Sequence, residues 1–134
     1  MPQLNDFTGV WTLSRRIVQA SGPEGQFTGR AVFTPEGAGL RYHEAGQLVL
    51  AGEAPMQAER DYLWHAEGAQ IVVRFEDGRD FHRFDPSLAE AAHWCDPDDY
   101  RVRYDFARWP AWSAEWRVTG PRKDYVMISR YTRA

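Results

Sequence analysis

The fold is decided by residues 62–84, YLWHAEGAQIVVRFEDGRDFHRF. Apolar and polar side chains alternate along three short runs in this stretch, and a turn signal, Glu67-Gly68 or Asp77-Gly78, separates each run from the next. Strict alternation is typical of strands with one buried face, and Asp-Gly between such strands is a strong hairpin signal. The stretch therefore predicts three antiparallel strands.

Tight turns at these two places also predict which residues face each other across neighbouring strands. Because side chains alternate with a period of two, residues paired in this way share one face. The expected pairs are Ile71 with Phe84, Val73 with His82 and Phe75 with Asp80 for the second turn, and Trp64 with Ile71, Tyr62 with Val73 and Arg60 with Phe75 for the first.

The same alternation runs from Gly9 to Tyr131 without a helical pattern, in roughly ten or eleven strands. Sheets of that many twisted strands usually curl and close. We therefore expect an all-β protein, an antiparallel up-and-down β-barrel of about ten strands occupying residues 1–134 as a single domain. Its inner face is expected to hold Trp11, Leu13, Arg15, Ile17, Phe27, Gly29, Ala31, Phe33, Leu40, Tyr42, Glu44, Leu48, Leu50, Tyr100, Val102, Tyr104, Phe106, Trp112, Ala114, Trp116, Val118, Tyr125, Met127, Ser129 and Tyr131.

Composition excludes several classes of protein. Net charge is −3 with basic and acidic residues interspersed, so nucleic acid is not an expected partner. No apolar run approaches the roughly 20 residues of a membrane span. The N-terminus lacks the features of a signal peptide, and the single cysteine, Cys95, is expected to be a small buried residue in a cytoplasmic protein.

Gly9-Val10-Trp11 resembles the first strand of the lipocalin-like, or calycin, barrels, which begin with Gly-x-Trp and often end with an arginine that covers the tryptophan. Arg130 and Arg133 are the candidates for that arginine. A hairpin within Leu40–Leu50 would bring the total to eleven strands and place the arginine far from Trp11. Further segments resemble an uncharacterised bacterial domain family of that group: Gly29–Phe33, Tyr42–Gly46, Asp77–His82 and Gly120–Tyr125. The resemblance implies a barrel fold and no established activity.

Charged residues on the predicted inner face are candidates for a site, because buried charges are rare unless they are paired. Arg15 and Glu44 can reach each other across Gly29, either as a structural salt bridge or as a site for a polar ligand group. Arg60 either pairs with Asp80 or anchors an anionic ligand, since its planar guanidinium matches a carboxylate.

His82 and His93 are expected to face each other from neighbouring strands. Three alternatives remain open: a hydrogen-bonded structural pair, a ligand-contacting or acid–base pair, and a zinc site with Cys95 and Asp80. The spacing matches no strong zinc motif, and we assign no metal and no cofactor.

The chain holds six Trp, seven Phe and six Tyr residues, which is more than closing a core requires. Large flat side chains also line cavities for small molecules. We expect the barrel to bind a small, partly apolar molecule, with an anionic ligand favoured by Arg60. The expected contacts are Arg60, Tyr62, Trp64, His82, His93, Tyr104, Trp112 and Trp116.

Two other functions fit the same pattern. One is a small barrel enzyme that uses His82 or His93 as a general acid or base. The other is an interaction module, because Phe81 and Trp94 are expected to pair on the outer face, and Val126 and Ile128 also point outward. An apolar outer patch of this kind favours a homodimer.

Overall fold

The computed structural model describes the whole chain, residues 1–134. One short 3₁₀ helix, η1 (Leu4–Phe7), precedes ten strands. The strands are β1 (Gly9–Gln19), β2 (Gly25–Glu36), β3 (Gly39–Leu50), β4 (Met56–Glu67), β5 (Gln70–Phe75), β6 (Asp80–Phe84), β7 (Glu90–Cys95), β8 (Asp98–Asp105), β9 (Trp112–Gly120) and β10 (Lys123–Arg133).

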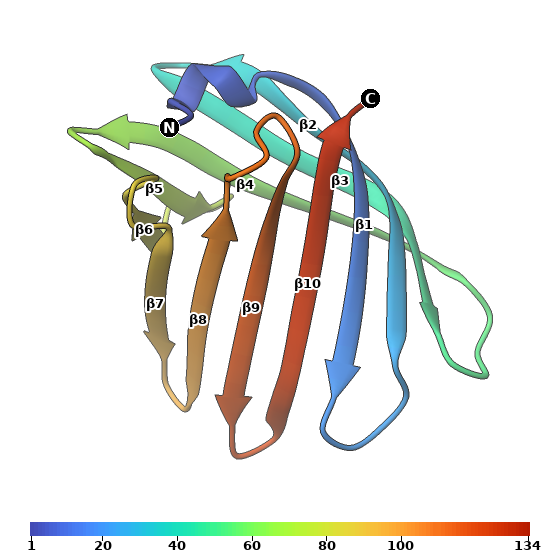
Figure 1. The fold of residues 1–134 in the computed structure, drawn as a ribbon. Helices are drawn as coiled ribbons and strands as arrows, with labels where there is room; N and C mark the ends of the chain where they lie inside the picture. Colours follow the sequence, from blue (N-terminus) through green and yellow to red (C-terminus); the bar gives the residue numbers. More distant parts are fainter.

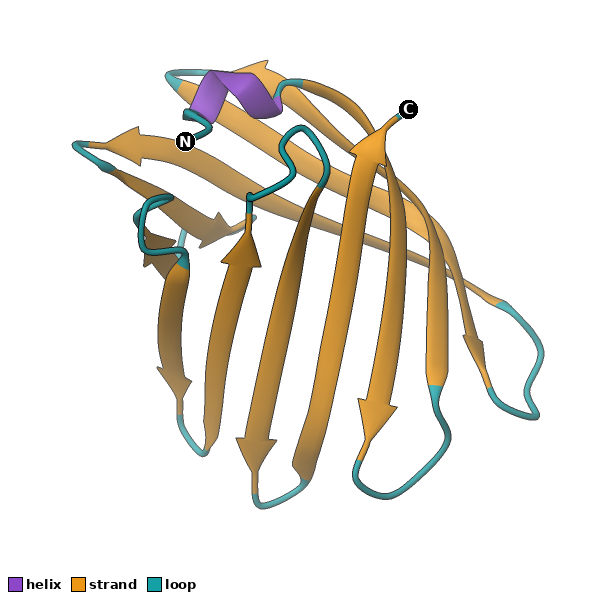
Figure 2. Cartoon of the chain, viewed as in Figure 1, coloured by secondary structure: helices purple, strands orange, loops and turns teal.

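The strands form one antiparallel sheet that curls into a nearly closed up-and-down barrel (Figure 1). Their order is β6-β5-β4-β3-β2-β1-β10-β9-β8-β7, so every neighbour in the sheet is also a neighbour in sequence except the β1–β10 pair. The two edge strands, β6 and β7, approach each other without forming a hydrogen-bonded ladder. The predicted all-β barrel of about ten strands is confirmed, and Figure 2 shows that η1 is the single helical element.

Residues 40–50 belong to one continuous strand, β3, so the alternative of a hairpin there is wrong. With ten strands, β10 runs antiparallel to β1, and Arg133 is the Cα partner of Trp11. The strand count therefore decides between the two candidate arginines: Arg133 lies over Trp11, whereas Arg130 is exposed on the outside.

The predicted inner face is confirmed except at Asp80, Phe81 and Cys95, and the register between β4 and β5 is shifted by two residues. Tyr62 pairs with Phe75 and Trp64 with Val73, because the two turn residues are Gly68 and Ala69 rather than Glu67 and Gly68. A slip of two keeps every side chain on its predicted face, whereas a slip of one would have inverted the strand.

The β5–β6 hairpin contains a β-bulge that the sequence pattern did not indicate. Val73 pairs with His82 as expected, but Arg74 pairs with Asp80, so Phe81 is an extra residue in β6 and the expected Phe75–Asp80 pair is wrong. A bulge of this kind turns two consecutive side chains toward the same face. Phe81 and His82 are both buried inside the barrel as a result.

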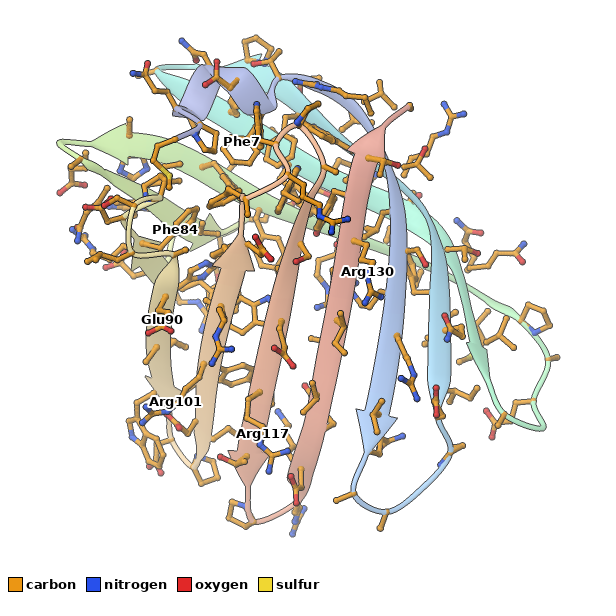
Figure 3. All side chains as sticks on the ribbon, in the orientation of Figure 1. Phe7, Phe84, Glu90, Arg101, Arg117 and Arg130 are labelled. Atoms are coloured by element: carbon orange, nitrogen blue, oxygen red, sulfur yellow. The ribbon has the colours of Figure 1, made fainter.

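One end of the barrel is closed by η1 and its aromatic neighbours. Phe7 is fully buried, with its ring centroid 4.9 Å from that of Trp109 and 5.2 Å from that of Trp112. Figure 3 shows Phe7 below the helix at the same end of the barrel as the C-terminus. In the same view Glu90, Arg101, Arg117 and Arg130 lie on the outer face, as their alternation predicts. No helix in the structure has the length and apolar character needed to cross a bilayer.

Candidate functional site

The barrel encloses a cavity of about 690 Å³ at the end opposite η1. Asp77, Cys95 and Lys123 mark its rim, at the β5–β6, β7–β8 and β9–β10 hairpins. All eight residues that the sequence nominated as ligand contacts line this cavity: Arg60, Tyr62, Trp64, His82, His93, Tyr104, Trp112 and Trp116. The strands β4, β6, β7, β8 and β9 supply them, because each strand sends alternate residues inward.

A buried ion pair forms one side of the cavity. The Arg15 guanidinium donates to both carboxylate oxygens of Glu44, at 2.7 and 2.9 Å, and its Nε donates to the Ser129 hydroxyl at 2.7 Å. Glu44 also accepts a 2.6 Å hydrogen bond from the Tyr42 hydroxyl, which lies 2.9 Å from the Tyr131 hydroxyl. The predicted Arg15–Glu44 pair is therefore present, and the two opposite charges neutralise each other.

The electrostatics of Glu44 follow from these contacts. Burial alone would raise the pKa of its carboxyl, but the hydrogen bonds and charge of Arg15 and the Tyr42 hydroxyl lower that pKa below its ordinary value. Glu44 is therefore an ionised group inside the barrel, balanced by Arg15.

Arg60 is different, because no carboxylate lies within 4.0 Å of its guanidinium. The expected pair with Asp80 is wrong, since Asp80 faces outward and lies 3.4 Å from Arg74. The single side-chain hydrogen bond of Arg60 goes to the Tyr62 hydroxyl at 3.4 Å. Arg60 is thus a cavity-lining cation without a carboxylate partner.

His82 and Tyr104 form a buried hydrogen-bonded pair at the inner end of the cavity. His82 Nε2 lies 2.9 Å from the Tyr104 hydroxyl, while His82 Nδ1 is buried without a partner. Burial, with a smaller contribution from His93, lowers the pKa of His82 to about 3, and burial raises the pKa of Tyr104. Both groups are therefore neutral near pH 7. The buried indole nitrogens of Trp64 and Trp112 also have no hydrogen-bond partner.

His93 lines the same cavity from β7, but it is not paired with His82, because β6 and β7 share no ladder. Its ring instead meets Phe81 edge-on, with centroids 5.4 Å apart. Cys95 is exposed, so its expected burial is wrong, and Asp80 is engaged by Arg74. The four residues of the zinc alternative therefore do not form one cluster, and no group of three or more potential metal ligands occurs elsewhere.

Phe81 is the main residue that the sequence analysis placed wrongly. It was expected on the outer face beside Trp94, but it is buried, whereas Trp94 is 63 % exposed. The predicted outer Phe81–Trp94 pair does not exist. The error has a single cause: the bulge adds one residue to β6, and no residue type in the Arg79–His82 segment signals it.

Comparison with known proteins gives a family and a fold. A family model described as "Family of unknown function (DUF6314)" matches residues 7–133. The chain is similar to the solved structure of the S-type phycobiliprotein lyase CPES from Guillardia theta, with a TM-score of 0.63 and 8% sequence identity. That match covers 98% of this chain and 90% of the lyase chain. No curated protein sequence matches the chain.

Proposed function

The chain belongs to the DUF6314 family of unknown function, and from this premise we propose that its barrel binds a small, partly apolar, anionic molecule. The observation that carries the proposal is the unpaired guanidinium of Arg60 on the wall of an aromatic cavity. A planar guanidinium with free donors is suited to a carboxylate or another oxyanion.

The balance of charge around the cavity supports an anion. Each lining carboxylate already has a cationic partner: Glu44 has Arg15, Asp61 and Glu76 have Arg41, and Asp77 has Arg79. Of the lining cations, Lys123 lies 2.9 Å from Asp98 and Arg15 is bound to Glu44. Arg60 is the lining arginine with no carboxylate within 4.0 Å; its cross-strand neighbour Glu44 is already bound by Arg15, and Arg60 is open to solvent.

The apolar character of the ligand follows from the remaining walls. The eight proposed contacts include Tyr62, Trp64, Tyr104, Trp112 and Trp116, together with His82 and His93. Concave sites with mainly aromatic walls and few polar groups are typical of small-molecule binding. The similar fold of the phycobiliprotein lyase supports a ligand-binding function for this barrel. At 8% sequence identity, the comparison does not identify the ligand of this chain.

The state of His82 disfavours acid–base catalysis by that residue. With a pKa of about 3, its ring is a weak base and is not protonated near neutral pH, so it cannot donate a proton as a general acid. A neutral histidine bonded to Tyr104 is suited to orienting a ligand.

We also propose that the protein is cytoplasmic. The support is the single cysteine, Cys95, which forms no disulfide and fits a reducing compartment. The proposed homodimer contact on the outer face consists of Trp94, Val126 and Ile128, because Phe81 lies inside the barrel.

Two fluorescent probes test the anion site. The first, 1-anilinonaphthalene-8-sulfonate, is anionic, and the second, N-phenyl-1-naphthylamine, has the same rings without the sulfonate. We expect Arg60→Gln to weaken binding of the sulfonate by about tenfold or more, which corresponds to about 1.4 kcal/mol, and to leave the neutral probe within about twofold.

Arg30→Gln is the matched control, because Arg30 is exposed on the outer face of β2 and makes no side-chain hydrogen bond or ion pair. Equal loss of both probes in Arg60→Gln, or equal loss of the sulfonate in Arg30→Gln, would contradict an anion site at Arg60.

A further inference from the structure

Phe81 stacks on three aromatic rings: Phe75 of the neighbouring strand β5, with centroids 4.6 Å apart and planes 24° apart, and the more distant Trp116 and Tyr62. Its ring is tilted 7° from Trp116 of β9, with centroids 5.1 Å apart, and 21° from Tyr62 of β4, with centroids 5.6 Å apart. β4 and β9 are on opposite sides of the sheet order, so these two residues approach Phe81 from different walls. Both distances lie within the range of about 4.5–7 Å that is typical of stacked rings, and we call the space that Phe81 fills beside Tyr62 and Trp116 the slot.

The inward position of Phe81 depends on the bulge in β6. In the regular hairpin that Asp77-Gly78 favours, Phe75 would face Asp80 and Phe81 would point outward beside Arg74. β6 is a five-residue edge strand that forms a ladder with β5 alone. Short edge segments with few backbone partners open at low free energy. A regular pairing of the same hairpin would therefore turn Phe81 out of the slot, whereas the observed bulged pairing holds it inside.

A group that displaces Phe81 finds polar partners at both ends of the slot. Arg60 contacts the hydroxyl of Tyr62, the residue that forms one wall, so a carboxylate on a ring stacked against Tyr62 reaches the guanidinium. His82 meets the Phe81 ring edge-on, with centroids 4.7 Å apart, and its buried Nδ1 lacks a partner.

We propose that the ligand is a flat, conjugated carboxylate whose ring system takes the place of Phe81 between Tyr62 and Trp116 while its carboxylate binds Arg60. This inference rests on the proposed function and adds to it the shape of the ligand and the residue that yields to it. A saturated, globular anion of similar volume would bind Arg60 but has no flat face to stack on Tyr62 and Trp116. Phe81 is therefore a specificity-determining residue.

Two carboxylates of different shape test the proposal by titration calorimetry: anthracene-2-carboxylate, which is flat, and adamantane-1-carboxylate, which is globular. If only a fraction of the protein has Phe81 out of the slot, its apparent affinity for a flat ligand is reduced by that fraction. We expect Phe81→Ala to tighten binding of the anthracene by about tenfold and to change binding of the adamantane by less than about threefold.

Phe106→Ala is the matched control, because Phe106 is an equally buried phenyl that stacks on Tyr104 and does not line the cavity. Trp116→Leu provides a second variant if Phe81→Ala does not fold. It removes one stacking partner, so the anthracene should bind about tenfold more weakly, whereas the adamantane, which has no flat face to stack, should lose less than about threefold.

Nuclear Overhauser contacts in the unmodified protein give a direct readout. Protons of bound anthracene should contact the rings of Tyr62 and Trp116, and the contact between Phe81 and Trp116 should disappear. Weaker anthracene binding in Phe81→Ala, or a retained Phe81–Trp116 contact, would overturn this inference. If both carboxylates bind with similar affinity and depend on Arg60, the proposed anion-binding function is supported and the preference for a flat ligand is refuted. If neither carboxylate binds, both proposals are refuted.

Discussion

The guanidinium carbon of Arg133 lies 3.9 Å from the centroid of the Trp11 ring, and the two residues are also direct Cα partners in the β1–β10 ladder. The terminal nitrogens of Arg133 donate to the backbone oxygens of Thr8 at 2.8 Å and Asp6 at 2.6 Å. Trp11 Nε1 in turn donates to the Phe7 oxygen at 2.8 Å. These contacts join the last strand, the first strand and η1 at the closed end of the barrel.

We expect Arg133→Met to destabilise the fold by about 1–3 kcal/mol, because the cation–π contact and two charge-assisted hydrogen bonds are lost while the aliphatic stem is kept. Urea unfolding measures the change. Arg130→Met is the control, since Arg130 is exposed on the same strand and should alter stability by less than about 0.5 kcal/mol. Equal effects of the two substitutions would show that Arg133 does not secure η1.

The second prediction concerns the ion pair inside the cavity. Glu44→Gln should cost about 3 kcal/mol or more, because Arg15 stays charged and buried without its carboxylate partner. Glu24→Gln removes the partner of Arg16 from an exposed pair and should change stability little, because solvent screens the pair. Thermal and urea unfolding of both variants measure the difference. A Glu44 variant as stable as the parent would mean that Arg15 finds water or another partner.

The third prediction concerns the dependence of stability on pH. The folded-state pKa of His82 is about 3, below its ordinary value of 6.5, so between these values the unfolded state binds a proton that the folded state does not. The free energy of unfolding should therefore fall as pH decreases from 6.5, by up to about 1.4 kcal/mol per pH unit.

The window from pH 6.5 to pH 5 isolates this effect, because most carboxyl groups titrate below it. Urea unfolding of His82→Gln should show a much flatter profile there, whereas His65→Gln, a change at a half-buried surface histidine, should keep the slope. Nitrogen shifts of the His82 ring should remain those of a neutral imidazole at pH 5. A ring that titrates near pH 6.5 would contradict the burial of His82.

The fourth prediction concerns the close approach of β2 and β3, where Gly29 is paired with Gly46. A Cβ atom on Gly29 would clash with the Ala45 carbonyl oxygen and lie 2.6 Å from the Gly46 Cα, so backbone rather than a flexible side chain would have to move. Gly29→Ala should cost about 1–3 kcal/mol or more. Thr28→Ala, at an exposed neighbouring position, provides the comparison in thermal unfolding. A variant that melts with the parent would show that the two strands can separate freely at this point.

Much of the inner face could be predicted because a strand has a side-chain period of two. Arg15, Glu44, Arg60 and Tyr104 lie inside as the alternation requires, and the register error of two between β4 and β5 left Tyr62 and Trp64 on the predicted face. An alternating pattern specifies which face each side chain occupies. A register shift of two residues at a turn changes only which inner residues are neighbours.

Three features could not be predicted in the same way. η1 is four residues long, and Phe7 is buried by rings from distant strands, so no local period marks it. The separation of β6 and β7 depends on how ten strands curl, which brings His93 near Phe81 rather than opposite His82. The bulge at Phe81 replaces the regular β5–β6 pairing by an irregular one, and no residue type in this segment marks the change.

The sequence by itself therefore determined the barrel, an approximate strand number and most of the residues that face its interior, because alternation and turn residues act locally along the chain. Only the tertiary structure decided which of these inner groups meet. Arg15 is neutralised by Glu44 and Asp80 by Arg74, so Arg60 is left free. Whether an inward-facing charge is balanced depends on distances across the barrel, and Phe81 lies inside because the bulge turns it toward Phe75, Tyr62 and Trp116, on which it stacks.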